Sequence, residues 1–427
     1  MKVLVIGSGG REHALCWKLR QSPLLDELYC APGNPGIGQI ADLVPIGGDE
    51  IHKLADFATD LKIDLTVVGP ELPLTLGIVD DFQNHGLTIF GPRRQAAELE
   101  GSKVFSKEFM KRHGIPTARF EIAHDADEAR RVAAGFGFPV VLKADGLAAG
   151  KGVMIPKNTE ELEAALQVFF EDRRFGKAAE RVVVEECLVG EEVSFIALSD
   201  GERVLPLATS KDYKRLREHD QGPNTGGMGA HSPAGIVPSG MGAQILDQVV
   251  RPTISGLADE NRRFTGVLYV GLMLTAEGPR VLEYNVRFGD PEAQALLMRM
   301  EQDLLPVLHR GAQGRFESGR LHFRKEASAC LVLASRGYPE KPIKGEPITG
   351  LAEAAALDGV EVFHAGTALK DGQVVAAGGR VLNVCATGPQ LIDALRRAYA
   401  GAGQVRWPSK ILRQDIGRQV VERASGG

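Results

Sequence analysis

The sequence predicts a multidomain protein of mixed α/β and α+β class, and three observations lead to this prediction. The chain has 427 residues, which is more than one hydrophobic core usually serves, so two to four domains are expected. Its first hundred residues alternate short apolar runs with helical stretches, as in a doubly wound parallel sheet. From Ala327 onward the signals are mainly strand-like, which indicates a small strand-rich C-terminal domain.

The N-terminal elements follow one another as strand and helix. "KVLVIG" is an apolar run that ends in glycine, and the helical stretch "REHALCWKLRQS" comes after it. "DLTVVGPE" and "LTIFGP" are two further apolar runs, each ending in Gly-Pro. Repeated strand–helix units of this kind predict parallel strands joined by helices.

The middle of the chain changes character near Gly101. "GSKVFSKEFMKRHGIP" predicts a helix that Gly114 stops, and "FPVVLKADGLAAGKGVMIP" predicts two strands around a glycine-rich loop. "NTEELEAALQVFFED" has helical spacing with Asn158 as its cap. Strands with a turn at Asp200-Gly201 follow, and residues 210–235 are polar and glycine-rich, which predicts a long loop. "SACLVLAS", "VEVFHAG" and "RVLNVCATG" then predict C-terminal strands, and "QLIDALRRAYA" predicts a closing helix.

Composition and charge exclude several classes of protein. The chain is 44% hydrophobic and 25% charged, with a net charge of -5, which gives no electrostatic case for nucleic acid as a partner. No apolar run approaches the roughly 20 residues of a membrane span, and the N-terminus is too short in apolar residues for a secretory signal. The five cysteines form no Cys-x-x-Cys pair, which favours a reducing cytoplasm over a disulfide or zinc framework.

The stretch "EYNVRFGD" places an acid, an amide and a guanidinium at alternate positions. Side chains two apart in a strand share a face, so Glu283, Asn285 and Arg287 are expected to point the same way. A half-buried strand facing solvent would have the same pattern. The alternative is a grip on a metal ion and a phosphate, and this stretch alone leaves both open.

The N-terminal glycine loop, Gly7 to Glu12, differs from a dinucleotide-binding fingerprint. That fingerprint needs a glycine where this chain has Glu12, so a standard nicotinamide or flavin site is disfavoured. The glycines still leave backbone N–H groups bare at a helix start, which suits a phosphate. A tight turn with no ligand is the other interpretation.

The segment from Lys143 to Gly152 is also not a P-loop, because Gly152 stands where a hydroxyl should bind magnesium. Two strands around a glycine loop suggest a flap over phosphates, with Lys143 as a fixed positive charge inside it. A surface hairpin is the weaker alternative, since "FPVVLK" draws this lysine into a sheet and an unpaired buried ammonium is costly. In the acidic run "VVVEECLVGEE", backbone groups can hydrogen-bond a purine edge and a carboxylate can accept ribose hydroxyls, but taken alone the run is mostly a solvated acidic turn.

The order of these features along the chain resembles that of an ATP-grasp ligase. "VLVIGSGGREHAL", "GPE", "KADGLAAGKGV", "GPNTGGMGA" and "NVRFGDPE" resemble, more narrowly, the glycinamide ribonucleotide synthetase family. The likeness runs from Met1 to about Ile416. It implies an ATP-grasp core of residues 103–326 with a mobile lid at about 120–190, after an N-terminal domain of residues 1–102 and before a C-terminal domain of residues 327–427.

The resemblance also implies a reaction and its partners. ATP, glycine and 5-phosphoribosylamine would give glycinamide ribonucleotide, ADP and phosphate through glycyl phosphate, a step of purine synthesis. Mg²⁺ or Mn²⁺ would be the cofactor, and a cytoplasmic monomer without nucleic-acid or membrane partners is expected.

The resemblance assigns residues as follows. Arg287, Lys143 and Asp212 would be catalytic, and Glu283 and Asn285 would bind the metal ion. The ATP site would consist of Lys103, Lys143, Gly146, Gly150, Lys151, Gly152, Glu185, Glu186, Leu188 and Glu192. The second substrate would be held by Gly9, Gly10, Arg11, Glu71, Asn224, Thr225, Gly226, Gly227, Arg287, Asp290, Pro291 and Glu292.

Three other classes of protein share some of these features. A carboxylase-type ATP-grasp enzyme would share the nucleotide half but is not expected to carry "GPNTGGMGA". Glu12 counts against a nicotinamide-dependent oxidoreductase. A nucleotide sensor without catalysis would have no need for a charge clamp such as Arg287.

Overall fold

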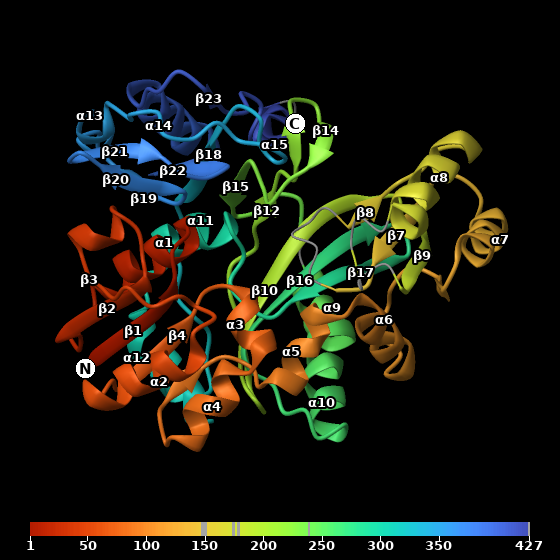
Figure 1. Ribbon diagram of the computed structural model, residues 1–427, viewed down its shortest axis with the longest axis horizontal. Coiled ribbons are helices and arrows are strands. Elements are labelled where there is room, and N and C mark those ends of the chain that lie inside the picture. The colour runs from red at the N-terminus through yellow and green to blue at the C-terminus, as the bar shows by residue number, and fades with distance from the viewer. Residues whose placement is uncertain (147–151, 173–175, 177–179, 238–239, 426–427) are drawn as a thin grey trace.

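The computed structural model describes residues 1–146, 152–172, 176, 180–237 and 240–425. Figure 1 shows the N-terminal module beside the C-terminal one, with a long central sheet and a separate lid extending away from both. Within the described residues, no helix is long and apolar enough to cross a membrane. The expected α/β and α+β multidomain architecture is confirmed.

The N-terminal module is a parallel sheet of strand order β3-β2-β1-β4-β5. Because the order reverses between β1 and β4, the loops at the carboxyl ends of these two strands flank the crevice where such sheets bind ligands. Those loops are Gly7–Arg11 and Gly69–Glu71. Its strands are β1 (Lys2–Gly7), β2 (Glu27–Pro32), β3 (Asp42–Leu43), β4 (Leu65–Val68) and β5 (Ile89–Phe90), and its helices are α1 (Gly10–Leu19), α2 (Ile51–Asp60), α3 (Glu71–Leu76), α4 (Ile78–Asn84) and α5 (Arg94–Gly101).

The lid is an antiparallel sheet of order β6-β9-β7-β8, with its own small hydrophobic core. It contains β6 (Phe120–Ala123), α7 (Ala126–Phe136), β7 (Val140–Ala144), β8 (Val153–Met154), α8 (Thr159–Leu166) and β9 (Val182–Glu186). The Asn158 side chain accepts a hydrogen bond from the Glu161 N–H at 2.8 Å, so the predicted cap of α8 is confirmed.

The central sheet has the order β11-β10-β16-β17 and lies between the lid and the N-terminal module. Its strands are β10 (Glu191–Asp200), β11 (Val204–Pro206), β16 (Thr265–Thr275) and β17 (Gly278–Asn285). The accompanying helices are α6 (Lys103–Arg112), α9 (Met241–Ile245), α10 (Arg251–Asp259), α11 (Glu292–Arg299) and α12 (Leu304–Ala312). Helix α11 packs against α1, so the end of β17 leads directly to the N-terminal module.

The C-terminal sheet has the order β12-β15-β18-β22-β19, with β23 paired to β18. Strands β12 (Lys211–Asp212) and β15 (Gly229–Ser232) come from the middle of the chain, and the hairpin β13 (Arg215–Arg217) and β14 (Gln221–Asn224) lies between them. The prediction of one long loop at 210–235 was therefore wrong, because these short strands pair with a sheet far along the sequence. The other elements are β18 (Ala327–Ser335), α13 (Leu351–Ala355), β19 (Val360–His364), β20 (Thr367–Lys370), β21 (Gln373–Ala376), β22 (Arg380–Gly388), α14 (Leu391–Gln404), β23 (Lys410–Ile411) and α15 (Arg418–Ser425).

Candidate active site

Two lysines converge where the lid meets the central sheet. Lys103 begins α6, and its Nζ donates to the carbonyl oxygen of Gly146 at 3.2 Å. Lys143 lies near the end of β7, and its Nζ donates to the carbonyl oxygen of Leu282 at 2.9 Å. Leu282 is the residue that β17 leaves unpaired at a bulge opposite Gly271 and Leu272, so its carbonyl is free to accept. The structure thus brings the two predicted phosphate-binding lysines to one place beside Glu283.

Asp145 fixes the start of α6 next to β7. Its Oδ1 accepts hydrogen bonds from the Ser102 hydroxyl at 2.7 Å and from the Val104 N–H at 3.2 Å. A carboxylate at a helix N-terminus is favourable because it satisfies an unpaired N–H and faces the positive end of the dipole. Burial lowers the pKa of Lys103 below its usual range. Asp145 was not among the predicted site residues, although it lies in the quoted motif "KADGLAAGKGV".

Glu185 and Glu186 point in opposite directions, as neighbours in a strand must. The Glu185 carboxylate is buried between the ammonium groups of Lys107, at 3.0 Å, and Lys143, at 3.1 Å. The Glu186 carboxylate instead pairs with the exposed guanidinium of Arg119 at 2.7 Å. The two glutamates were predicted together for the ATP site. The structure separates them: Glu185 holds the lysines, and the side chain of Glu186 faces the surface.

Two further residues of the predicted ATP site, Leu188 and Gly152, are among those that the structure describes. Leu188 is half-buried in the connection from β9 to β10, and the carbonyl oxygen of Gly152 accepts the Ala144 N–H at 2.8 Å. Gly150 and Lys151 lie outside the described residues.

Glu283, Asn285 and Arg287 occupy one face, as the alternation predicted. The Asn285 Oδ1 accepts from the Arg287 guanidinium at 3.0 Å, and the intervening Tyr284 and Val286 are buried in the hydrophobic core. Burial alone would raise the pKa of Glu283, but the charges of Lys214, Lys103, Lys143 and Arg287 outweigh it and lower this pKa to about 2. Glu283 is therefore an ionised carboxylate among cations.

Arg287 is held by carboxylates from the N-terminal module. Its Nε lies 3.3 Å from Glu71, the first residue of α3, and its terminal nitrogen lies 3.1 Å from Glu100. Glu100 also accepts the Val286 N–H at 2.7 Å. Burial raises the pKa of Glu100, although the Arg287 charge acts against that rise. Glu100 escaped sequence reasoning because nothing near it in the chain marks it.

A third lysine, Lys214, completes this face. It forms an ion pair with Glu192 and lies 3.5 Å from Glu283. Burial alone would lower the pKa of Lys214, but the neighbouring carboxylates raise it well above its usual range. Burial also raises the pKa of Asp212, the predicted catalytic residue, although Lys214 acts against this rise. The sequence predicted a polar, glycine-rich loop here and named Asp212 as a candidate, but it gave no signal for Lys214.

The donor set on β17 suits a hard divalent cation. Glu283 and Asn285 offer a carboxylate and an amide oxygen, the ligands that Mg²⁺ and Mn²⁺ prefer. The cross-strand neighbour of Glu283 is Gly271, which brings no second carboxylate. No group of three or more histidine, cysteine or acidic side chains suited to a metal ion occurs among the described residues. These two residues therefore fit an ion whose other ligands are phosphate oxygens and water.

The N-terminal glycine loop faces this region from the carboxyl end of β1. Glu12 turns back to accept the Gly9 N–H at 2.6 Å and also binds the Arg11 guanidinium at 2.6 Å. Its carboxylate fits only because Gly69 has no side chain: a Cβ there would lie 2.0 Å from the Glu12 Oε1. Arg11 donates to the Phe288 carbonyl at 3.1 Å, so it joins α1 to the end of the "NVRFGDPE" segment.

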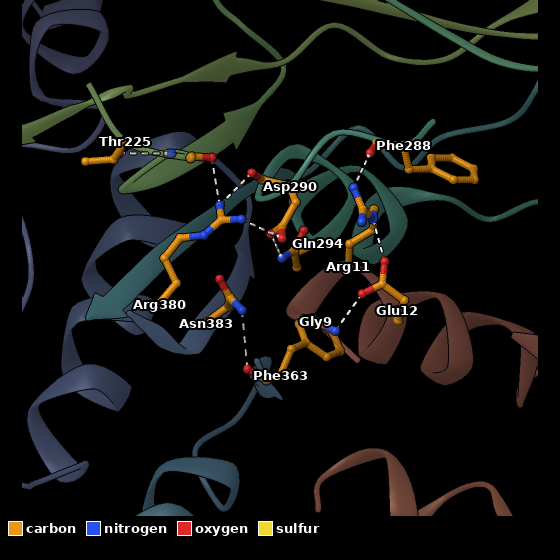
Figure 2. Close-up of polar contacts among 12 residues, drawn as sticks. Gly9, Arg11, Glu12, Thr225, Phe288, Asp290, Gln294, Phe363, Arg380 and Asn383 are labelled. Carbon is orange, nitrogen blue, oxygen red and sulfur yellow. Dashed lines mark hydrogen bonds and ion pairs between the residues drawn. The ribbon is translucent and has the colours of Figure 1, made fainter. Parts of the chain in front are cut away.

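Arg380, at the start of β22, binds two of the loops that were predicted to hold the second substrate. Figure 2 shows it beside Asp290 and the loop that contains Thr225. Its guanidinium lies 2.8 Å from the Asp290 carboxylate and donates to the carbonyl oxygens of Asp290 and Gly226 at 2.7 Å. The Tyr338 hydroxyl accepts the Gly226 N–H at 2.9 Å. The C-terminal domain thus supplies residues that local motifs did not reveal.

Two buried amide side chains, Gln294 and Asn383, lie against Gly10. Gln294 donates to Asp290 at 2.7 Å, while the Gln294 Oε1 and the Asn383 Oδ1 are buried and have no hydrogen-bond partner among the described residues. Buried acceptors of this kind are uncommon unless a ligand or water completes them. Sequence reasoning missed both residues.

The remaining residues predicted for the second substrate lie in β14, in the loop after it and at the start of α11. Asn224 ends β14, the Thr225 hydroxyl accepts the Gly227 N–H at 3.0 Å, and Gly227 packs directly against Pro291. Glu292 is buried at the start of α11, where it accepts from the Ser194 hydroxyl at 3.3 Å.

A lysine-lined face under a lid, with a carboxylate and amide on one strand, defines an ATP-grasp enzyme. Sequence comparison agrees: family models for the phosphoribosylglycinamide synthetase N domain, ATP-grasp (A) domain and C domain match residues 1–100, 101–293 and 328–419. The chain therefore belongs to the phosphoribosylglycinamide synthetase family. Its activity is the ATP-dependent joining of phosphoribosylamine and glycine in purine biosynthesis.

Individual relatives support this over the full length. The chain is 50% identical to the phosphoribosylamine–glycine ligase of Agrobacterium fabrum over 99% of both chains, and 48% identical to that of Pseudomonas aeruginosa over 100% of both. The crystal structure of this ligase from Thermotoga maritima matches with a TM-score of 0.83 and 35% identity, covering 97% of this chain and all of that one. A biotin carboxylase from Campylobacter jejuni shares the fold at a TM-score of 0.74, over 96% of this chain and 92% of that one, but is only 14% identical.

Proposed function

We propose that this ligase forms glycinamide ribonucleotide through glycyl phosphate, at the face shared by β7, β17 and the 212–214 segment. A glycine carboxylate oxygen attacks the γ-phosphorus of ATP and ADP leaves. The amine of phosphoribosylamine then attacks the acyl carbon, and phosphate leaves with the oxygen that came from glycine. The observation that carries this proposal is the convergence of Glu283, Asn285 and Arg287 with two lysines.

Charged side chains of this chain provide most of the stabilisation in the first step, the transfer of the γ-phosphoryl group to glycine. Lys103 and Lys143 hold the ATP phosphates, and Arg287 stabilises the charge that develops on the transferred phosphoryl group. Mg²⁺ or Mn²⁺, held by Glu283 and Asn285, would neutralise phosphate charge and fix its orientation. Glu71 and Glu100 keep the Arg287 guanidinium in place, so no reorganisation is needed during the reaction.

The second substrate lies between the modules. We assign its phosphate to the N–H groups of Gly10 and Arg11 in the first turn of α1 and to Arg380. Helix N-termini and bidentate guanidinium groups both suit phosphate. The amide oxygens of Asn383 and Gln294 accept from ribose hydroxyls, which gives these buried acceptors partners. The Asp212 carboxylate accepts a hydrogen bond from the ammonium group of glycine. The lid excludes water from the acyl phosphate.

The domain limits 1–102, 103–326 and 327–427, the monomer and the cytoplasmic location stay proposals. All five cysteines are free thiols, which supports a reducing compartment. Sedimentation of the purified chain would test the monomer.

Oxygen transfer tests the intermediate directly. Glycine labelled with ¹⁸O in its carboxylate is incubated with ATP and phosphoribosylamine, and the released phosphate is analysed by mass spectrometry. One labelled oxygen in each phosphate is expected, because the carboxylate oxygen that attacks phosphorus stays on it. Unlabelled phosphate formed together with product would contradict an acyl phosphate.

A further inference from the structure

Residues 212–214 connect two different environments. The side chains of Asp212 and Lys214 face the nucleotide site, where Lys214 pairs with Glu192 and lies 3.5 Å from Glu283. The intervening Tyr213 points the other way, because side chains alternate along extended chain. It is 4% exposed and belongs to the hydrophobic core of the C-terminal domain. This segment therefore presents active-site charges on one face and is anchored in another domain by the opposite face.

Arg413 is the main anchor of that opposite face. Its side chain is 1% exposed, and its guanidinium lies over the Tyr213 ring at 5.1 Å from the centroid. Two of its nitrogens donate to the Asp415 carboxylate at 2.8 Å, and a third donates to the Asp220 carboxylate at 2.9 Å and to the Arg215 carbonyl at 3.0 Å. One buried guanidinium thus joins the segment after Lys214 to the C-terminal end of the chain.

The surroundings of Arg413 fix its position. The Tyr399 hydroxyl donates to the Arg413 carbonyl at 3.0 Å, and the Tyr213 hydroxyl accepts the Gly417 N–H at 2.9 Å. The turn at His219 and Asp220 has left-handed φ values of 56° and 52°, which are uncommon for residues other than glycine. Asp415 accepts the His219 N–H at 2.8 Å, so it stabilises this turn from the C-terminal side.

We infer that Arg413 is a positioning residue of the ligase: through Tyr213 and Asp220 it sets the place of Lys214 and Asp212 in the active site. This gives the C-terminal domain a part in the first half-reaction, away from the second substrate. The inference rests on the proposed role of the β17 face. The planar Arg413 guanidinium donates to several fixed acceptors at once. A lysine ammonium, which is a single point charge, could not bind all of these acceptors in the same geometry.

The test compares four variants in the full chain. Arg413→Met removes the anchor, and Asp220→Asn weakens only its link to the hairpin, at a half-exposed side chain. Lys214→Met removes the positioned charge. Arg418→Met is the matched control, because Arg418 is an exposed arginine nearby whose partner is Glu422. Steady-state turnover, the KM for ATP and the thermal unfolding midpoint are measured for each, and turnover is also measured for the double variants with Lys214→Met.

Arg413→Met is expected to lower kcat by about twentyfold or more, with the KM for ATP within about threefold, because a misplaced charge mainly affects the transition state. Asp220→Asn should give a smaller loss of the same kind, and Arg418→Met none. In the Lys214→Met background, the loss from Arg413→Met should largely disappear, since coupled residues are not additive.

Several outcomes would overturn the inference. One is a folded Arg413→Met protein with unchanged kcat. Another is a fold-loss in kcat from Arg413→Met that is as large in the Lys214→Met background as in the native chain. If Arg413→Met does not fold, the same comparison is made with Asp220→Asn, alone and combined with Lys214→Met. An equal fold-loss in kcat in both backgrounds would then overturn the inference. Failure of the proposed site is distinguishable, because Lys214→Met alone would then leave kcat unchanged.

Discussion

The buried Glu185 carboxylate gives a prediction whose magnitude follows from the structure. Glu185→Gln keeps the shape of the side chain and removes its charge, which lies between Lys107 and Lys143. All three side chains are at most 9% exposed. Removing one partner of a buried ion pair typically costs about 3–5 kcal/mol, because it leaves an uncompensated charge.

Part of this cost is relieved by proton release from Lys107. Burial lowers the pKa of Lys107 to about 8, and the Glu185 charge keeps it from falling further. Without that carboxylate the ammonium loses its proton near neutral pH, so we expect the lower end of the range, about 3 kcal/mol. Calorimetry should then show the unfolding midpoint lower by about 3 °C, because the unfolding entropy of a 427-residue chain is about 0.9 kcal/mol/K. Lys143 also loses a fixed partner, and the KM for ATP should rise by about tenfold, the effect of about 1.4 kcal/mol.

Glu186→Gln is the matched control, one residue along the same strand. Its carboxylate pairs with Arg119, whose side chain is 69% exposed, and such surface pairs contribute about 0–1 kcal/mol. The unfolding midpoint and the KM for ATP should therefore change little. If both variants behaved alike, the inward and outward roles assigned to these two glutamates would be refuted.

Three further predictions concern the charge clamp, the metal ion and pH. Arg287→Met should lower turnover by about a hundredfold or more while ATP affinity, measured by equilibrium dialysis, stays within about tenfold; equal losses in both would make Arg287 a ground-state contact. Glu283→Gln should raise the half-saturating Mg²⁺ concentration in the ADP-release assay by about tenfold, and an unchanged titration would contradict its ligand role. Burial lowers the pKa of His231 to about 4, and burial together with His364 lowers that of His13 to about 3. Between pH 6.5 and 4 the unfolded chain therefore binds protons that the folded chain does not, so stability should fall as pH falls, by on the order of 3 kcal/mol for each histidine; a flat unfolding midpoint over this window would exclude it.

Strand periodicity predicted the part of the site that is local in sequence. Glu283, Asn285 and Arg287 share a face because they are two residues apart, and no tertiary information is needed for that. The same rule places the side chains of Glu185 and Glu186 on opposite faces of β9, which is why the two carboxylates have different partners.

The residues that sequence reasoning missed are those whose partners lie far along the chain. Glu100 accepts the N–H of Val286, 186 residues away, and Arg380 pairs with Asp290, 90 residues away. Each is an ordinary charged residue in its own segment, and only the folded chain gives it a partner. For the same reason no local signal predicts the pairing of β15 with β18. The sequence Gly229–Ser232 is typical of a loop, and it forms a strand because its backbone pairs with β18 of the C-terminal sheet.

Glu12 illustrates how a departure from a familiar pattern has structural meaning. In a dinucleotide site this position is glycine, and the bare helix N-terminus receives a pyrophosphate. Here the Glu12 carboxylate accepts the Gly9 N–H and occupies space that Gly7 and Gly69 leave open. A carboxylate of α1 itself therefore neutralises part of the positive N-terminal end of this helix, and less of that positive end is left to bind a ligand. In the proposed site, a single phosphate that also receives the Arg380 guanidinium from the C-terminal domain suits this arrangement better than a pyrophosphate.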